Sequence, residues 1–221
     1  MLTLIVPVLN ESELITPFLS SLQPLRQSGC EVIVVDGGST DDTVALATPL
    51  VDSVIHSDKG RGRQMNAGAA QATNDILLFV HVDSVLPVNL PELVTSSCYP
   101  GNWGFFQVQL SGRHPLFRMI ESCMNTRSRL TGVATGDQCL IIGKELFIKS
   151  GGFPDIPLME DVAFTKTLKQ HMSPVVIYER VITSSRRWEQ QGIIKTILQM
   201  WWLRLLYFLG VSPERLVKSY Y

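Results

Sequence analysis

The most informative part of this sequence is the run Ile76-Leu77-Leu78-Phe79-Val80-His81-Val82-Asp83-Ser84. It is apolar at both alternating sets of positions, which is typical of a strand that is buried on both faces in a parallel sheet. Because side chains two residues apart on a strand share a face, we expect His81 and Asp83 to project together from its carboxyl end. Open α/β sheets bind their ligands at that end. A short loop with an ordinary surface aspartate is the alternative interpretation.

Length and composition indicate a single domain of α/β size. The chain has 221 residues, of which 45% are hydrophobic, so it is long enough to bury a full core. The formal net charge of −1 gives no indication of a nucleic-acid partner. The cysteines, Cys30, Cys98, Cys123 and Cys139, lie far apart without metal-ligand spacing, and we interpret them as reduced core residues of a cytoplasmic protein. The amino terminus reads as a strand and not as a signal peptide.

Strands and helices are predicted to alternate along the chain. Strands are expected at residues 2–9, 31–36, 54–56, 76–84, 103–110, 138–142 and 175–184. Helices are expected between them, among others at residues 65–72, 114–130 and 159–171. Short connections predict a parallel, right-handed sheet for residues 1–84. We therefore expect an α/β fold with a Rossmann-like, mostly parallel sheet flanked by helices. Its nucleotide-binding half would be residues 1–84 and its acceptor half residues 85–191, with an apolar helical segment at 192–221.

Polar residues follow the first two strands as well. Asn10 and Glu11 come after strand one and Asp36 ends strand two, so they are expected at the same sheet edge as Asp83. A carboxylate there is well placed to accept hydrogen bonds from a base or a ribose. The alternative for Asp36 is a turn former before Gly37.

A basic, glycine-rich segment precedes the fourth strand. Lys59, Arg61 and Arg63 alternate with glycines and are suited to hold a diphosphate through charge-assisted hydrogen bonds. The segment matches neither the P-loop pattern nor GxGxxG.

The second half offers three further polar groups. Gly136 and Asp137 precede a strand, whereas Glu160 and Asp161 open a helix, where adjacent residues diverge by about 100°. Only one of these two acids can therefore easily reach a given substrate atom. First-turn acids that favour the helix dipole are the alternative. The segment Arg186-Arg187-Trp188 suits a phosphate or sugar, but equally a membrane surface or a core edge.

Taken in order, these motifs resemble the family 2 glycosyltransferases, which have the GT-A fold. The resemblance covers nearly the whole chain and rests on Pro7-Val8-Leu9-Asn10-Glu11, Val35-Asp36-Gly37-Gly38-Ser39-Thr40-Asp41, Lys59-Gly60-Arg61-Gly62-Arg63-Gln64-Met65-Asn66-Ala67-Gly68, His81-Val82-Asp83, Glu160-Asp161 and Arg186-Arg187-Trp188. The short length and the Ser184-Ser185-Arg186-Arg187-Trp188 ending are most similar to a small bacterial subgroup whose acceptor is uncertain.

The resemblance implies a role for each matching position. Nucleotide-binding residues would be Pro7, Val8, Asn10, Glu11, Asp36, Gly38, Arg61, Arg63, Gln64, Asn66 and His81, with Asp36 facing the base. The acceptor or phosphate side would comprise Gly136, Asp137, Arg186, Arg187 and Trp188.

The same resemblance implies the catalytic and metal residues. Asp83 would be the metal ligand of the DXD motif, and Asp161, next to Glu160, would be the catalytic base of the ED motif. His81 departs from the pattern because it replaces the first acid of DXD. The metal site then has one protein carboxylate fewer, so metal affinity in the absence of the nucleotide should be weak.

The expected function is therefore an inverting glycosyl transfer that depends on Mg²⁺ or Mn²⁺. The sugar would move from a nucleotide sugar, expected to be UDP-linked, to an acceptor hydroxyl. A nucleotide-binding module without turnover is the alternative that His81 suggests. A sugar nucleotidyltransferase ranks below both, because it would need a glycine-rich loop straight after strand one.

The segment 192–209 is apolar but barely reaches the ~20 residues that a membrane span needs. Lys195, Gln199 and Arg204 interrupt it, so no span is expected. One interpretation is a helix packed on the domain or across a homodimer. The other is an interfacial helix, which Trp201 and Trp202 suit, on the inner face of the membrane. Such a helix would bring the site to a lipid-linked acceptor.

Overall fold

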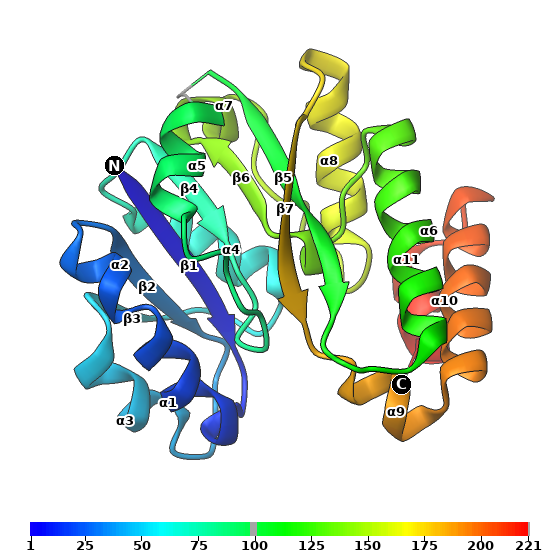
Figure 1. Ribbon diagram of the computed structural model, residues 1–221, viewed down its shortest axis with the longest axis horizontal. Coiled ribbons are helices and arrows are strands. Elements are labelled where there is room, and N and C mark those ends of the chain that lie inside the picture. Colours follow the sequence, from blue (N-terminus) through cyan, green and yellow to red (C-terminus); the bar gives the residue numbers. More distant parts are fainter. Residues whose placement is uncertain (98–100, 221) are drawn as a thin grey trace.

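One central sheet contains the strands of the described chain, in the spatial order β3-β2-β1-β4-β6-β5-β7 (Figure 1). The computed structural model describes residues 1–97 and 101–220. The strands are β1 (Leu2–Val8), β2 (Glu31–Asp36), β3 (Ser53–His56), β4 (Ile76–Phe79), β5 (Trp103–Leu110), β6 (Leu140–Gly143) and β7 (Val175–Thr183).

The first four strands are parallel, as the alternation of strands and helices predicts. β1 pairs with β2 on one side and with β4 on the other, and β3 pairs with β2. The register aligns Val8 with Asp36 and Ile5 with Phe79. The segments that follow β1, β2 and β4 therefore leave the sheet at the same edge.

The second half of the chain extends the sheet. β6 is antiparallel to both of its neighbours, β4 and β5, whereas β7 is parallel to β5. The mostly parallel sheet that the sequence predicts is thus confirmed.

Helices cover both faces of the sheet (Figure 1). They are α1 (Ser12–Ser21), α2 (Gln23–Gln27), α3 (Thr43–Ala47), α4 (Arg61–Gln71), α5 (Leu90–Ser97), α6 (Pro115–Thr131), α7 (Lys144–Lys149), α8 (Glu160–His171), α9 (Arg186–Gln191), α10 (Ile193–Phe208) and α11 (Pro213–Tyr220), with 3-10 turns η1 (Thr48–Leu50) and η2 (Gly136–Gln138). The sequence interpretation lacks α2, α5 and α9, which are too short for a clear apolar period.

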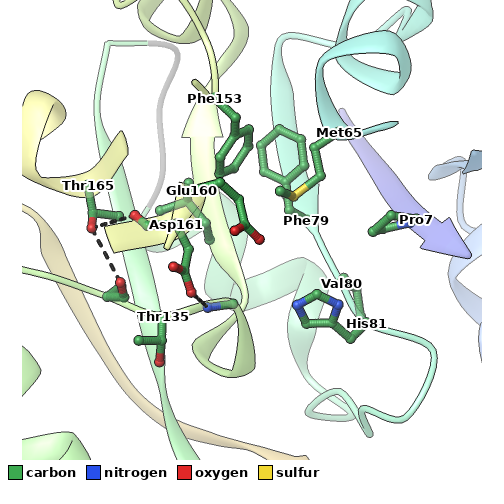
Figure 2. Close-up of a pocket in the computed structure, with 13 residues that line it drawn as sticks. Pro7, Met65, Phe79, Val80, His81, Thr135, Phe153, Glu160, Asp161 and Thr165 are labelled. Atoms are coloured by element: carbon green, nitrogen blue, oxygen red, sulfur yellow. Dashed lines mark hydrogen bonds between the residues drawn. The ribbon is translucent and has the colours of Figure 1, made fainter. Parts of the chain in front are cut away.

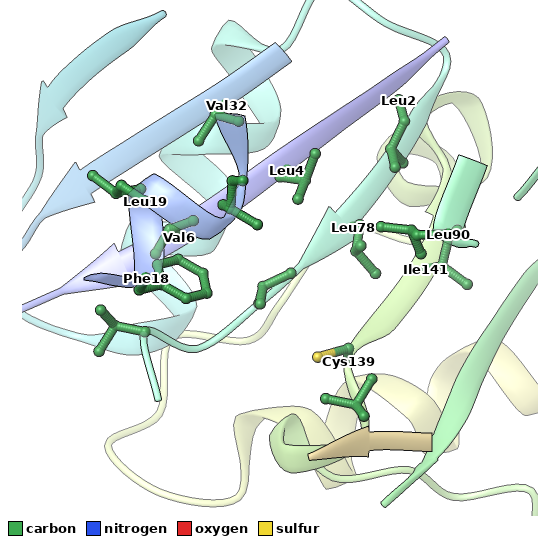
Figure 3. Close-up of a cluster of buried hydrophobic side chains, with 14 of the residues drawn as sticks. Leu2, Leu4, Val6, Phe18, Leu19, Val32, Leu78, Leu90, Cys139 and Ile141 are labelled. Atoms are coloured by element: carbon green, nitrogen blue, oxygen red, sulfur yellow. The ribbon is translucent and has the colours of Figure 1, made fainter. Parts of the chain in front are cut away.

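Alternating side chains of β1 divide the core into two layers. Leu4 and Val6 point to the face that α1 covers, where Phe18 and Leu19 pack against them (Figure 3). Ile5 points to the opposite face and belongs to the cluster of α4, α7 and α8. Both faces of the central strands are therefore buried, which explains their continuous apolar runs.

The strand predicted at residues 76–84 is shorter in the structure. β4 ends at Phe79, and the amide of Ser84 donates to the carbonyl of His81 to close a turn. Val80 and Val82 are buried in the first core layer, so the apolar pattern continues although the strand does not. The expectation that His81 and Asp83 share a strand face is therefore wrong, because strand alternation does not extend into a turn.

The cysteines are less uniform than predicted. Cys139 is buried, whereas Cys30 is half-buried and Cys123 is exposed, and all three are free thiols. Cys123 lies on the solvent side of α6, so its assignment to the core is wrong. Cys98 lies outside the described residues.

The carboxyl-terminal helix α10 packs on the domain along one side only. Ile193 and Ile197 contact the cluster around Phe117 of α6, and the fully buried Leu203 joins a cluster with Leu216 of α11. The opposite side exposes Ile194, Leu198, Trp201, Trp202, Leu205 and Phe208. Among the helices of residues 1–97 and 101–220, none combines the length and the apolar character that crossing a bilayer requires.

Candidate active site

A large cleft lies where β1 and β4 end and where α4 and α8 begin. Its volume is about 890 Å³, which suits a small organic ligand. Of the residues that the sequence singles out, the cleft is lined by Pro7, Val8, Glu11, Arg61, Arg63, Gln64, His81, Asp83, Glu160, Arg186 and Arg187. Most of the predicted nucleotide site is therefore brought together at one sheet edge.

Two of the predicted residues hold a loop instead of lining the cleft. The Oδ1 of Asn10 accepts a hydrogen bond from the amide of Thr40 (2.8 Å), and the Asn10 amide donates to Oγ of Ser39 (2.9 Å). Asp36, 2% exposed, accepts from the amides of Gly38 (3.1 Å) and Ser39 (3.0 Å). Both side chains thus fasten the loop between β2 and α3. Whether Asn10, Asp36 and Gly38 contact a nucleotide stays a prediction.

The Asp36 carboxylate is kept ionised by this loop. Burial raises its pKa, but hydrogen bonds from Ser39, Gly38 and His56 outweigh that effect, so the pKa is lowered. The Nδ1 of His56 lies 3.2 Å from Oδ2 of Asp36. Asp36 therefore acts as a charged acceptor in the fold itself.

Asp41 is a structural residue of this loop. Its carboxylate accepts hydrogen bonds from the amides of Ser12 (3.1 Å) and Thr43 (3.1 Å). The hydrogen bond from the Thr43 hydroxyl, together with the others, lowers the pKa of Asp41 to about 2. The residue joins the start of α1 to the loop after β2. Its position within a Ser-Thr-Asp-Asp-Thr run is the signal that could have revealed this role.

The side chains of α4 divide between the cleft and its scaffold. Gln64 donates to the carbonyls of Val8 and Val35, each at 2.8 Å, and Asn66 exchanges two hydrogen bonds with the backbone of Phe153. Since these amides are occupied by the backbone, they set the position of α4. That either binds a nucleotide stays a prediction.

The arginines of α4 carry the positive charge of the cleft. Arg63 forms a two-pronged pair with Asp155 at 2.7 and 2.8 Å on the exposed rim. Arg61 lies with its guanidinium 3.9 Å from Oε1 of Glu160, at the inner end. Of the two arginines of α4, Arg61 is therefore the one that faces the carboxylate of Glu160.

His81 is packed against the turn η2. A Cβ atom on Gly136 would lie 2.5 Å from Nε2 of His81, so any larger residue would force the imidazole or the turn to move. Burial, assisted by the charge of Arg61, lowers the pKa of His81 to about 3, which keeps the imidazole neutral. Asp83, two residues on, is exposed at the cleft rim.

Glu160 and Asp161 occupy the first turn of α8, beside the small apolar cavity of about 20 Å³ that Figure 2 shows. Both oxygens of Asp161 accept backbone hydrogen bonds, from the amides of Gly136 and Val162, each at 2.6 Å. Glu160 is nearly buried, and burial together with the Asp161 carboxylate raises its pKa to about 7, although Arg61 opposes the shift. The two acids therefore have different environments.

A second, smaller pocket of about 200 Å³ adjoins the cleft. It is lined by most of the residues predicted for the acceptor side, namely Gly136, Asp137, Arg187 and Trp188, and by both Glu160 and Asp161. Arg186 lines the cleft instead. Asp83, Arg61 and Glu160 line both spaces, so the two lie side by side.

Helix α10 also lines this second pocket, which we call the acceptor pocket after the residues predicted for the acceptor side. Thr196, Met200 and Arg204 reach it from one helix face. Sequence reasoning treats the segment only as a packing or membrane element. The spacing of four residues was the available signal, since such residues share a helix face.

The acidic residues fit a divalent cation that binds together with a substrate. In the described part of the chain, no group of three or more His, Cys, Asp and Glu side chains is arranged to hold a metal. Mg²⁺ is commonly bound by one or two carboxylates plus substrate phosphates. Asp83, exposed in the cleft, is suited to that mode.

Comparison with known proteins identifies the family. The model described as Glycosyl transferase family 2 matches residues 3–120, which is more than half of the chain. The chain is 33% identical over 93 residues to a PGL/p-HBAD biosynthesis glycosyltransferase of Mycobacterium bovis, covering 39% of this chain and 36% of that protein. It is 25% identical over 96 residues to poly-beta-1,6-N-acetyl-D-glucosamine synthase of Staphylococcus aureus, covering 41% and 23%. The matches thus span about a third of these relatives or less.

Solved structures show the same fold. Mannosyltransferase PcManGT from Pyrobaculum calidifontis, in complex with GDP-Man and Mn²⁺, superposes with a TM-score of 0.62 and 24% identity over 82% of this chain and 56% of that one. TarS 1-349 of S. aureus, in complex with UDP-GlcNAc, has a TM-score of 0.65 and 20% identity. The match covers 83% of this chain and 58% of that one. Glucosyl-3-phosphoglycerate synthase from Mycobacterium tuberculosis, in complex with Mg²⁺ and UDP, has a TM-score of 0.59 and 18% identity. The match covers 83% of this chain and 70% of that one.

The expected GT-A-like architecture is therefore confirmed. The family match includes the loop after β2 and the turn after β4, and the structural matches extend the likeness over most of the second half. On these grounds, the chain belongs to glycosyl transferase family 2.

Proposed function

We propose that this chain transfers a sugar from a nucleotide-sugar donor to an acceptor hydroxyl, with inversion at the anomeric carbon. The donor that we propose is a UDP-sugar. The observation that carries the proposal is that Asp83, Arg61 and Glu160 line both the cleft and the acceptor pocket. A donor in the cleft and an acceptor in the pocket would meet at these residues.

The size and charge of the cleft support a nucleotide-sugar donor. Arg61, Arg186 and Arg187 line it and are suited to a diphosphate. TarS and PcManGT, which share the fold, were crystallised with UDP-GlcNAc and GDP-Man. The expectation of UDP rests on the family resemblance, so the base is part of the test.

Asp83 is the residue that would hold Mg²⁺ or Mn²⁺ together with diphosphate oxygens. When bound, such a cation supplies charge neutralisation for the departing nucleoside diphosphate. Two proteins of the same fold were crystallised with Mn²⁺ or Mg²⁺. Asp83 is the only acid in the turn that follows β4. We therefore propose that the cation binds only together with the nucleotide.

Asp161 is our candidate for the general base. It lines the acceptor pocket, and its backbone partners leave one lone pair on each carboxylate oxygen for an acceptor hydroxyl. The acceptor oxygen attacks the anomeric carbon while the nucleoside diphosphate leaves with the bonding electron pair, and Asp161 takes the hydroxyl proton. A single displacement of this kind inverts the anomeric centre.

The test is a panel of UDP- and GDP-sugars incubated with the full chain and Mn²⁺ or Mg²⁺. Release of the free nucleoside diphosphate supports the transferase. Tight nucleotide binding without any turnover, in the presence of varied acceptors, would support the inactive binding module. Formation of a nucleotide sugar from a sugar phosphate and a nucleoside triphosphate would support a nucleotidyltransferase.

We also propose that α10 attaches the protein peripherally to a membrane. Ile194, Leu198, Trp201, Leu205 and Phe208 form an exposed apolar stripe with alternating spacings of four and three residues. Tryptophan suits the headgroup zone, and the exposed Lys195 and Arg186 suit anionic lipid. Such attachment would place the acceptor pocket, on the other side of α10, near lipid-linked acceptors. Pairing of this stripe in a homodimer is the competing outcome.

A further inference from the structure

Helix α10 contributes a cation to the acceptor pocket. Its inner face presents Thr196, Met200 and Arg204 to the pocket, whereas the exposed stripe faces away. Arg204 is thereby brought into the same pocket as the proposed base, Asp161.

The guanidinium of Arg204 lacks a close partner. Its Nε is buried without a hydrogen-bond acceptor, and among the described residues we find no hydrogen bond or salt bridge that the group makes. Asp161 and Asp137 act on it only at longer range. Burial lowers the pKa of Arg204, and these two carboxylates oppose that shift.

A second arginine, Arg127, interacts electrostatically with Arg204. Arg127 of α6 also has a buried Nε without an acceptor, and its terminal nitrogen donates to Oγ of Ser128 at 2.9 Å. Burial, and after it the positive charge of Arg204, lowers the pKa of Arg127 to about 10. Both guanidinium groups remain cationic at neutral pH, so Arg204, which lines the pocket, also experiences the like charge of Arg127.

Such an arrangement is costly without an anion. Both arginines are half-buried, with their Nε atoms removed from water. A charge in such a place is tolerated when it is paired and hydrogen-bonded, and adjacent like charges repel. The local carboxylates do not supply the pairing, because among the described residues no hydrogen bond or salt bridge joins Asp161 or Asp137 to Arg204. A ligand with several anionic oxygens would satisfy Arg204 and offset the charge of Arg127.

We propose, on the basis of the function proposed above, that the acceptor carries a phosphate ester and that Arg204 binds this phosphate. Phosphate has oxygens in several directions and matches the fork of a guanidinium better than a single hydroxyl does. The phosphate would lie toward α10, and the hydroxyl to be glycosylated would lie toward Asp161. Trp188, Met124 and Met200 line the same pocket and supply its apolar surface.

The experiment uses the full chain saturated with UDP and Mn²⁺, so that the diphosphate site in the cleft is filled. Binding of glycerol 3-phosphate is compared with binding of glycerol by calorimetry. We expect measurable affinity for the phosphate ester only, and a loss of at least about 10-fold in Arg204→Gln. Arg204→Lys should retain part of the affinity because it keeps the charge.

Arg215→Gln is the matched control, since Arg215 is an exposed arginine of α11 that lines neither the cleft nor the pocket. It should bind glycerol 3-phosphate as the unmodified chain does. Equal affinity of the unmodified chain and a folded Arg204→Gln variant would overturn the proposal, as would equal loss in both variants. Thermal melts establish that each variant is folded, and Arg204→Lys serves if Arg204→Gln is not.

UDP binding is measured first and separately, so its failure counts against the donor assignment and not against the phosphate site. In that case the same comparison of variants is made without UDP. A second arm uses monomeric dihexanoyl phosphatidic acid. Tighter binding than that of glycerol 3-phosphate, lost in Arg204→Gln, assigns the phosphate to a lipid-linked acceptor. Equal or weaker binding assigns it to a water-soluble one.

Discussion

The backbone amide of Gly136 donates a hydrogen bond of 2.6 Å to Oδ2 of Asp161, and the same glycine leaves the space that the ring of His81 occupies. The turn η2 therefore connects the loop after β4 with the first turn of α8. A substitution at residue 136 should therefore shift both His81, on the proposed donor side, and Asp161, the proposed base.

We predict that Gly136→Ala destabilises the protein by about 1–3 kcal/mol, because the new methyl group would overlap Nε2 of His81. Urea denaturation measures the change. In a His81→Ala background the same substitution should cost clearly less, since the overlapping ring is gone. Strictly additive effects of the two substitutions would show that the contact with His81 is not the cause.

Asp161→Asn should lower turnover by about 10²–10⁴-fold, the usual effect of removing a general base. Donor binding should be unchanged, because Asp161 lines the acceptor pocket and not the cleft. Steady-state kinetics and UDP titration give the two values. Near-normal turnover in Asp161→Asn with an inactive Glu160→Gln would transfer the role to Glu160.

Asp83→Ala should abolish the metal-dependent part of nucleotide binding and leave the fold intact, since the side chain is exposed in a turn. Calorimetry with UDP, with and without Mn²⁺, measures this part. Asp155→Ala is the control, because Asp155 also lines the cleft but pairs with Arg63. Unchanged Mn²⁺-UDP affinity in Asp83→Ala would contradict the metal assignment.

The raised pKa of Glu160 predicts a pH-dependent stability. Because the folded protein binds this proton more tightly than the unfolded chain, the contribution of Glu160 is present below its ordinary pKa of 4.5 and is lost as the pH rises toward about 7. Glu160→Gln removes the titration. Its Tm relative to the unmodified protein should therefore be higher at pH 8 than at pH 5, as thermal melts at both values will show. An equal difference at the two pH values would mean that Glu160 is ionised throughout.

The exposed stripe of α10 predicts flotation of the protein with anionic liposomes. Replacing Trp201, which is 64% exposed, and Leu205 with glutamate should abolish flotation and leave the melting temperature nearly unchanged. The alternative outcome is that the unmodified protein does not float and elutes as a dimer. If the two substitutions then make it monomeric, the stripe is a homodimer interface.

The first half of the fold and the location of the site were readable from the sequence. Buried parallel strands need apolar residues on both faces, and the residues after them must lie at one sheet edge. Asp83 and Glu11 could therefore be assigned to one sheet edge before their positions were known, and both line the cleft.

Only the tertiary contacts show which of the predicted site residues line the cleft and which hold the backbone in place. Asn10, Asp36 and Gln64 carry the same polar groups whether they face a ligand or a loop, and only the packed backbone shows which carbonyls and amides they satisfy. The end of β4 at Phe79 was hidden for a similar reason, because Val80 and Val82 are buried in a turn as completely as they would be in a strand.

Helix α10 separates the two kinds of information most clearly. Its apolar character and its helical spacing are local properties, so the sequence alone indicated a helix with a membrane or protein partner. Which residues face inward depends on where α6, α8 and α11 place the helix relative to the sheet. Only that long-range packing brings Arg204 to Asp161, across a sequence distance that no local pattern encodes.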